Sequence, residues 1–281
     1  MRVLAPAKTN LFLEVTGKRP DGYHELDTVF IELDLADELE IESAADLEVV
    51  AVGDPGVPSG PENLVWRAAD ALRKRAGRAA GARIAITKRV PSGGGLGGGS
   101  SDAARAIVAL DELWGLGLGR DALREVAATI GSDCAFFVEG GLQRGTGRGE
   151  ELEPLPRPRV PLDLVLVVPA ASCPTPQVYK ALAPFLGPPV RSPTGMLQAL
   201  ETGDREGVAR SLWNRLEGPC FQLFPEVARA KRDLEKRGLL ACLLSGSGAT
   251  VFGLARDRGQ AESVAAELRA EGKRAIAVRA G

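Results

Sequence analysis

A glycine-rich run is the part of the chain whose residue types point most directly to chemistry. Six glycines fill the seven positions from Gly93 to Gly99, between a predicted strand and a predicted helix that opens with Ser100, Ser101 and Asp102. Glycine reaches positive φ angles and lets a ligand approach the backbone closely. At a helix start, unpaired N–H groups and the positive dipole end attract phosphate. Mobile linkers do not usually lead into a capped amphipathic helix, so the run predicts a phosphate-binding loop. The predicted loop residues are Pro91, Ser92, Gly93, Gly94, Gly95, Leu96, Gly97, Gly98, Gly99, Ser100 and Ser101.

Three kinds of phosphate chemistry can be compared with this loop. The Walker pattern is absent, because both Gly-Lys pairs of the chain are followed by arginine. Protein-kinase chemistry requires H-R-D and D-F-G, but His24 precedes a glutamate and D-F-G does not occur. The dinucleotide pattern G-x-G-x-x-G matches at Gly93, Gly95 and Gly98. The acid that should end a strand about 20 residues later falls within a predicted helix, so a dinucleotide-binding oxidoreductase is the weaker alternative.

Two charged residues lie in places where a charge needs an explanation. Lys8 interrupts an apolar N-terminal segment, where a cation either extends outward or pairs with an internal carboxylate. Asp133 follows a predicted helix stop at Gly131 and precedes the apolar run 134–138, which we interpret as a strand. A carboxylate there either points into a cleft or caps a turn.

Composition narrows the function classes. The chain of 281 residues contains one histidine, which excludes a zinc site with two or three histidine ligands. A formal net charge of −2 and 5% aromatic residues argue against a generally basic nucleic-acid surface. No run approaches the roughly 18 apolar residues of a membrane span. The four cysteines lack C-x-x-C spacing, and the N-terminus does not resemble a signal peptide, so we expect buried thiols and a cytoplasmic protein.

The elements that would position these residues are predicted from periodicity and from turn residues. In the first half, strands are expected at 11–15, 28–35, 39–42, 47–52, 82–90 and 134–138, and helices from Asn63 and over 101–114 and 121–130. The proline-rich stretch 153–161 is the candidate boundary. Beyond it, strands are expected at 162–168, 239–244, 250–255 and 273–279, and helices near 176–186, 193–203, 204–216, 225–237 and 260–271. Strands and helices in both halves predict an α+β architecture.

The glycine loop resembles the ATP-phosphate motif Pro-x-x-x-Gly-Leu-Gly-x-Ser-Ser-Ala of the GHMP kinase superfamily. Other segments resemble the same family in the same order: 5–11 (Ala-Pro-Ala-Lys-Thr-Asn-Leu), 21–26 (Asp-Gly-Tyr-His-Glu-Leu), 130–137 (Ile-Gly-Ser-Asp-Cys-Ala-Phe-Phe) and 244–249 (Leu-Ser-Gly-Ser-Gly-Ala). The ordered set spans nearly the whole chain and is highly specific. Thr9, Ser132, Cys134 and Ala135 depart from the family pattern.

The resemblance implies a two-domain GHMP kinase fold. Residues 1–155 would form an N-terminal domain similar to the second domain of a ribosomal protein, with a left-handed crossover and the glycine-rich ATP loop. Residues 156–281 would form a ferredoxin-like C-terminal domain. ATP and substrate would meet in the cleft between them.

The resemblance also implies an activity, namely ATP-dependent phosphorylation of the 2-hydroxyl of 4-diphosphocytidyl-2-C-methyl-D-erythritol in the non-mevalonate isoprenoid pathway. Another small-molecule GHMP kinase activity is the nearest alternative. The implied catalytic residues are Asp133 as general base and Lys8 as its ion-pair partner. Asn63 and Lys88 would flank the adenine of ATP, with Mg²⁺ on the phosphates and no metal ligand assigned to the protein. The implied substrate-binding residues are Asn10, Tyr23, His24, Thr175, Tyr179 and Ser247. No nucleic acid or membrane partner is expected, and the chain is expected to be a monomer or weak homodimer.

Overall fold

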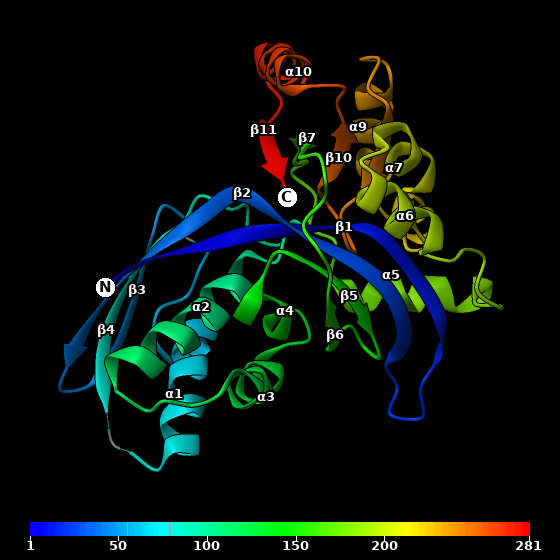
Figure 1. Cartoon of the computed structure of the whole chain (residues 1–281). Helices are drawn as coiled ribbons and strands as arrows, with labels where there is room; N and C mark the ends of the chain where they lie inside the picture. The colour runs from blue at the N-terminus through cyan, green and yellow to red at the C-terminus, as the bar shows by residue number, and fades with distance from the viewer. Residues whose placement is uncertain (55, 79) are drawn as a thin grey trace. The chain divides into compact units, whose positions relative to one another are not determined.

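The computed structural model describes residues 1–54, 56–78 and 80–281, which divide into two compact units (Figure 1). The first unit contains Met1–Ala7, Leu35–Ser92 and Gly97–Gly140. The second contains Lys8–Asp34, Gly93–Leu96 and Gly141–Gly281. Two long strands, β1 (Arg2–Lys18) and β2 (His24–Ala44), contribute residues to both units. The domain division between residues 155 and 156 remains a prediction.

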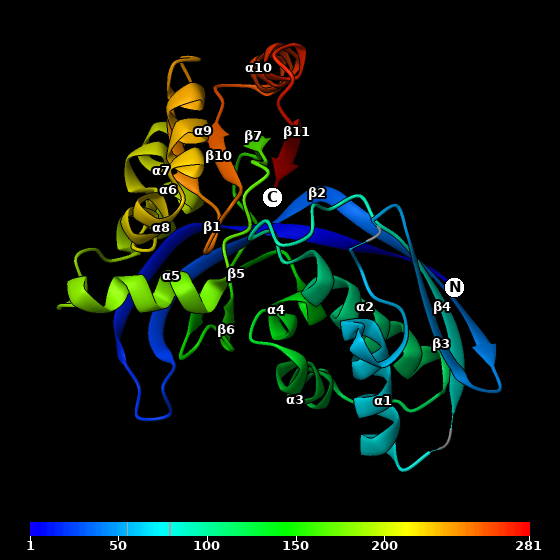
Figure 2. The same ribbon diagram turned by 180° about the vertical axis from the view of Figure 1, so that it is seen from behind.

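In the first unit, helices pack against a small sheet. In that sheet β4 (Gly81–Thr87) pairs with β3 (Leu47–Val52) in parallel and with the second half of β2 in antiparallel orientation. Figures 1 and 2 show the helices gathered on one side of β3 and β4. These helices are α1 (Leu64–Ala76), α2 (Gly98–Leu113), α3 (Arg120–Ile130) and α4 (Cys134–Glu139), and a short 3-10 turn, η1 (Gly60–Glu62), precedes α1.

Helix α1 begins and ends where local chemistry predicts. The Asn63 side chain accepts a hydrogen bond from the Val65 amide at 2.8 Å and so satisfies one of the unpaired N–H groups of the first turn. Gly77 ends the helix with φ of 63°, a left-handed conformation that glycine adopts without strain. The predicted start of a helix at Asn63 is therefore confirmed, with Asn63 as its N-cap.

The strand predicted at 134–138 is wrong, because these residues form helix α4. All five residues are apolar, and all five are buried. A run without alternating polar residues does not distinguish a strand from a buried helix. The Phe136 and Phe137 rings meet nearly edge to face, with centroids 4.9 Å apart. Asp133 consequently precedes a helix rather than a strand.

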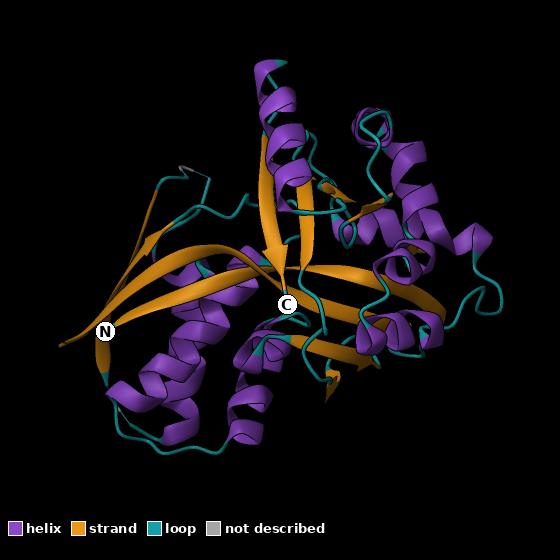
Figure 3. Ribbon diagram, turned by 45° about the horizontal axis from the view of Figure 1, so that its top comes forward, coloured by secondary structure: helices purple, strands orange, loops and turns teal. Residues whose placement is uncertain are grey.

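The second unit is built on a buried strand, β7 (Leu162–Val167). It pairs in antiparallel orientation with β10 (Val251–Leu254) and β11 (Ala275–Ala280), and β9 (Ala241–Leu244) extends the sheet beside β10. Helix α10 (Arg258–Ala270) packs on β7 and β11. Figure 3 distinguishes the helices, strands and loops by colour. The remaining elements are β5 (Leu142–Thr146), β6 (Glu151–Pro154), α5 (Thr175–Leu182), η2 (Ala183–Phe185), α6 (Thr194–Thr202) and α9 (Pro225–Glu235).

Two other predicted boundaries need correction. The runs 28–35 and 39–42 belong to the single strand β2. The helix expected over 204–216 ends early, as α7 (Arg205–Ser211), and is followed by β8 (Trp213–Asn214) and by α8 (Glu217–Leu223), which was not predicted. The reason is tertiary, because β8 pairs in parallel with β1 through Phe12 and Trp213. The periodicity of the local sequence gives no indication of that contact.

Residues 93–96 of the glycine loop are hydrogen-bonded to the second glycine-containing turn, residues 245–250, within the second unit. The carbonyl oxygen of Gly94 accepts from the Thr250 amide at 3.1 Å, and that of Gly95 accepts from Ser245 Oγ at 3.1 Å. Gly93 and Gly95 have φ angles of 69° and 75°. A Cβ on Gly95 would lie 2.2 Å from the Ser245 carbonyl oxygen, whereas one on Gly93 would meet nothing within 4 Å. Gly95 is therefore required for the close approach of two backbones, and Gly93 only for its φ.

Replacing Gly95 by Ala should destabilise the protein more than replacing Gly93 by Ala. Both variants carry the left-handed strain of roughly 1–2 kcal/mol, but only Gly95→Ala adds a clash with backbone, at roughly 1–3 kcal/mol more. Urea unfolding monitored by tryptophan fluorescence measures the difference in midpoint. Equal midpoints for the two variants would contradict the close contact with Ser245.

Candidate active site

The start of helix α2 has the features of an anion site. Gly97 occupies the N-cap position with φ of 71° and, having no side chain, supplies no acceptor to the amides of the first turn. The helix dipole adds partial positive charge at the same end. These amides are therefore suited to phosphate, as the sequence predicts for the loop that precedes them.

Lys88, predicted to flank adenine, lies in a buried cluster with Asp37 and Asp102. Its ammonium group donates to Asp37 Oδ2 and, at 2.6 Å, to Asp102 Oδ2, and all three side chains are almost inaccessible. Asp37 Oδ1 also accepts from the amides of Arg89 and Val90. Residues 88–90 enter the glycine loop and Asp102 lies in the helix that follows it. The cluster thus joins the two ends of the loop within the first unit.

Electrostatics in this cluster raise the pKa of both Asp102 and Lys88. Burial raises the pKa of Asp102 to about 7, with the Lys88 ammonium opposing the rise and the Asp37 carboxylate adding to it. Burial by itself would lower the pKa of Lys88, but the two carboxylates outweigh it and raise that pKa. The lysine therefore stays charged while Asp102 changes its protonation near neutral pH.

Lys8 and Asn10 lie on the same face of β1 and contact each other. The buried Lys8 ammonium donates to Asn10 Oδ1 at 2.9 Å and lies 5.1 Å from the centroid of the Phe30 ring. Asn10 Nδ2 in turn donates to Thr28 Oγ1 at 2.7 Å. This chain of contacts fixes which way the Asn10 amide points and so orients the acceptor that faces Lys8.

Asp133 occupies the N-cap position of α4, but its side chain does not cap the helix. Its backbone is helical there, with φ of −76° and ψ of −15°, whereas a capping residue usually has an extended backbone. The helix-cap alternative for this carboxylate is therefore not what the structure contains. Asp133 belongs to the first unit and Lys8 to the second, and their pairing remains a prediction.

Residues predicted for the substrate contact one another in the second unit. The His24 and Tyr179 rings stack with centroids 4.9 Å apart and planes tilted by 32°. Thr175 Oγ1 and Ser247 Oγ are hydrogen-bonded at 2.8 Å. Tyr23 is 54% exposed, with the Arg148 guanidinium 4.9 Å from its ring centroid. The structure thus brings two predicted pairs together, while Tyr23 lies against a residue that was not predicted.

His24 is poised to accept or donate a hydrogen bond as a neutral ring. Burial lowers its pKa, and the nearby Lys18 ammonium lowers it further, so the imidazole is uncharged at pH 7. Its Nε2 atom is buried and has no hydrogen-bond partner among the residues that the structure describes. An unpaired buried nitrogen beside an aromatic ring fits a planar, polar ligand.

Asn63, which the resemblance places beside adenine, has a structural role in the first unit. Besides capping α1 through Oδ1, it donates from Nδ2 to the Pro58 carbonyl at 2.7 Å. Both polar ends of this amide therefore have structural partners.

Asp37 was not identified from the sequence as a residue of the site. Its one signal was an acidic residue between the apolar runs 28–35 and 39–42 of β2.

The described residues were also searched for metal and membrane sites. Within residues 1–54, 56–78 and 80–281, no three His, Cys, Asp or Glu side chains are grouped so as to hold a metal ion. Over the same part of the chain, no helix is both long and apolar enough to cross a bilayer. A Mg²⁺ ion at this site would take its ligands largely from nucleotide phosphates and water, as is common for this ion.

Comparison with known proteins shows the relationships of the chain. Residues 63–141 match the family model for the GHMP kinases N terminal domain, and residues 196–274 match that for the GHMP kinases C terminal. A 4-diphosphocytidyl-2-C-methyl-D-erythritol kinase of Pelotomaculum thermopropionicum is 46% identical over 267 residues, 95% of this chain and 93% of the relative.

Solved structures add the fold. A crystal structure of 4-(cytidine 5'-diphospho)-2C-methyl-D-erythritol kinase is 41% identical with a TM-score of 0.85, covering 100% of this chain and 99% of that one. A homoserine kinase of Cytophaga hutchinsonii has a TM-score of 0.72 at 18% identity, over 100% of this chain and 94% of that chain. At that identity the second likeness concerns the fold alone.

Replacing Asp102 by Asn should flatten the pH dependence of stability. The pKa of Asp102 is about 7 in the folded protein and near 4 in the unfolded chain. Between about pH 4 and pH 7, Asp102 is therefore protonated in the folded state and ionised in the unfolded state. Stability therefore falls as pH rises through this range, by at most about 1.4 kcal/mol per pH unit, and Asp102→Asn removes this slope. Urea unfolding at several pH values between about 5 and 7 measures it.

Asp70→Asn is the matched control for that experiment. Hydrogen bonding from Lys74 is the main cause that lowers the pKa of Asp70, so its contribution is lost only as pH falls below about 4. Its slope between pH 5 and 7 should equal that of the wild type. An unchanged slope in Asp102→Asn would contradict the raised pKa.

Proposed function

We propose that this chain, which belongs to the GHMP kinase family, transfers the γ-phosphoryl group of ATP to the 2-hydroxyl of 4-diphosphocytidyl-2-C-methyl-D-erythritol. The family and the two-domain GHMP kinase fold, both predicted from sequence motifs, are confirmed by the two family models and the solved structures. The enzyme class is therefore an ATP-dependent small-molecule kinase rather than a dinucleotide-binding oxidoreductase. The assignment of this substrate rests on the similarity, over almost the whole chain, to proteins named for that reaction.

In the proposed reaction, the oxygen of the substrate hydroxyl forms a bond to the γ-phosphorus as the bond to the β–γ bridging oxygen breaks, and ADP leaves. Such transfers depend on positioning and charge stabilisation. The amides of residues 93–101 bind the phosphates. Bound to these phosphates, Mg²⁺ would supply positive charge against the charge that develops in the transfer.

The proton of the attacking hydroxyl passes to Asp133 in this proposal. Lys8 keeps that carboxylate ionised and helps to orient the hydroxyl. The network from Lys8 through Asn10 to Thr28 supports the proposal, because it holds the ammonium beside Asn10, which is itself a predicted substrate residue.

The cytidine end of the substrate is assigned to the stacked His24 and Tyr179. The neutral imidazole, with its unpaired Nε2, suits the polar edge of a pyrimidine, and the aromatic rings suit its face. Tyr23 adds a further exposed ring, and Thr175 and Ser247 supply hydroxyls. The placement of Asn63 and Lys88 beside the adenine stays a prediction, and the polar atoms of both side chains have protein partners. We place the reaction in the cytoplasm.

A coupled ADP-release assay tests the substrate. ADP should form rapidly with 4-diphosphocytidyl-2-C-methyl-D-erythritol and at least about a hundredfold more slowly, as kcat/KM, with mevalonate or homoserine, because only the first offers a pyrimidine to His24 and Tyr179. Comparable turnover with homoserine would assign the chain to another GHMP kinase activity. ATP binding without transfer to any of the three alcohols would make it a non-catalytic nucleotide-binding protein.

Asp133→Asn tests the base. Loss of the proton acceptor should lower kcat by about 10²–10⁴-fold, while ATP affinity stays near the wild-type value. Asp121→Asn, which changes an acid in the first turn of α3, is the control and should leave kcat unchanged. If Asp133→Asn keeps near-normal turnover, Asp133 is not the base.

A further inference from the structure

Glu14 is a buried carboxylate that the proposed reaction does not use. It lies on β1 with 0% of its surface accessible, on the same face as Lys8 and Asn10 because alternate residues of a strand share a face. Its Oε1 atom accepts from Arg215 Nη1 at 2.7 Å, and Oε2 accepts from Trp213 Nε1 at 3.0 Å. Burying a carboxylate is costly even when hydrogen bonds offset part of the desolvation. The position of Glu14 in the interior therefore calls for an explanation.

The surface segment 185–191, here named the α5 loop, is wrapped around this ion pair. Glu14 Oε2 accepts from the Val190 amide at 3.1 Å and from the Arg191 amide at 3.0 Å. Arg215 donates to the Pro188 carbonyl at 2.9 Å. It also donates to the carbonyls of Phe185 and Gly187, each at 3.3 Å.

Other contacts of the α5 loop are the packing of Leu186 on the core, a hydrogen bond from the Leu186 amide to the Ala183 carbonyl at 3.4 Å, and the Arg191 guanidinium 4.7 Å from the centroid of the Trp213 ring. The residues of the loop are exposed except Leu186, which is partly buried. Pro188 and Pro189 lack amide hydrogens and cannot take part in a regular ladder. Glu14 and Arg215 below the loop are hydrogen-bonded to its backbone at residues 185, 187, 188, 190 and 191, and so hold most of its length.

The α5 loop continues directly from helix α5, which carries Tyr179. At the first residue of the helix, Thr175 is hydrogen-bonded to Ser247. At the other end the chain passes through η2 into the α5 loop. Polar contacts thus fasten the first residue of α5 and the chain that follows η2, and Tyr179 lies between these two points against His24.

We propose that Glu14 is a positioning residue for the cytidyl end of the substrate. Together with Arg215 it orders the α5 loop, and through that loop it fixes α5 so that Tyr179 stacks on His24. This inference rests on the proposed function and adds to it a specificity-determining contact remote from the transferred phosphate. Binding energy at the cytidyl end requires that this wall be ordered before the substrate arrives.

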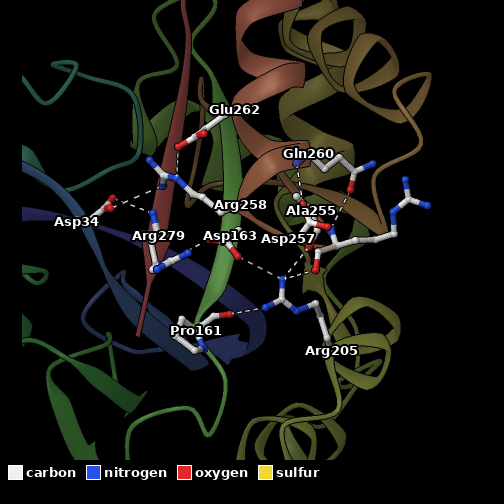
Figure 4. Close-up of polar contacts among 11 residues, drawn as sticks. Asp34, Pro161, Asp163, Arg205, Ala255, Asp257, Arg258, Gln260, Glu262 and Arg279 are labelled. Atoms are coloured by element: carbon white, nitrogen blue, oxygen red, sulfur yellow. Dashed lines mark hydrogen bonds and ion pairs between the residues drawn. The ribbon is translucent and has the colours of Figure 1, made fainter.

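The competing explanation is that Val178 and Leu182, both buried, hold α5 without help. A second buried carboxylate of the same unit separates the two explanations. Asp163 on β7 accepts from Arg279 Nε at 2.9 Å and pairs with Arg205 at 3.5 Å, as Figure 4 shows. Its partners come from β11 and α7 and not from α5. Asp163→Asn therefore matches Glu14→Gln in the kind of ion pair lost but leaves the α5 loop intact.

The experiment compares Glu14→Gln and Asp163→Asn in the full chain. Glu14→Gln should raise KM for the cytidyl substrate about tenfold, the scale expected when a binding wall must be ordered anew. Its kcat and its KM for ATP should stay within about twofold of wild type. Hydrogen exchange at the Val190 and Arg191 amides should quicken. Asp163→Asn should change neither the substrate KM nor the exchange of these two amides.

A double variant guards against misfolding of Glu14→Gln, which leaves Arg215 buried and unpaired. Glu14→Leu with Arg215→Met removes both charges at similar volume, a change that proteins often tolerate. It should fold and show the same rise in substrate KM, because the α5 loop loses the same hydrogen bonds.

Several outcomes would overturn the inference. One is faster exchange in the α5 loop with an unchanged substrate KM. Another is a double variant with wild-type KM. A third is equal changes in the KM of ATP and substrate, since a general loss of structure would produce them. If wild-type protein fails to phosphorylate the cytidyl substrate, the proposed function fails instead, and the exchange data still decide whether Glu14 orders the loop.

Discussion

A charge removed from water must find its partners inside the protein, and this requirement accounts for much of the local structure in both units. Lys88 lies between Asp37 and Asp102, and Glu14 is paired with Arg215. Leaving either partner alone in the interior costs several kcal/mol, so each cluster restricts the backbone segments that bring its members together. In both cases those segments adjoin residues predicted to bind ligand. The ion pairs therefore act on the site by limiting where its loops can lie.

The glycine loop shows how the same requirement combines with backbone geometry. Its central carbonyls accept hydrogen bonds from Thr250, Ser245 and Lys8. Lys88 and Asp102, which flank the loop in the sequence, belong to the cluster with Asp37. A carbonyl that is bound on the protein side leaves the neighbouring amides as the groups available to an anion. Positive φ at alternate glycines turns successive peptide groups in this way. A loop of flexible residues is thus made rigid by contacts outside the loop.

The parts of the fold that could be predicted from sequence are those that local chemistry determines. The start of α1 depends on a hydrogen bond between Asn63 and Val65, and the helix begins where the sequence predicts. Helix α4 could not be predicted, because a short, wholly buried apolar run satisfies strand and helix equally. The ends of α7 and β8 depend on pairing with β1, more than 190 residues away in the sequence. Long-range contacts of this kind leave no periodic signal.

The candidate site divides along the same line. The glycine run and the short motifs around Lys8, His24 and Asp133 could be found because their residue types are unusual for their surroundings. The partners that decide how such residues act could not be found. Lys88 is a nucleotide contact or a structural cation depending on residues 37 and 102, and nothing in the sequence near Lys88 refers to residue 37. The same holds for Glu14, whose partner at position 215 is known only from the folded chain. A charged residue in an apolar strand therefore predicts that a buried partner exists, and the fold is needed to say which segment supplies it.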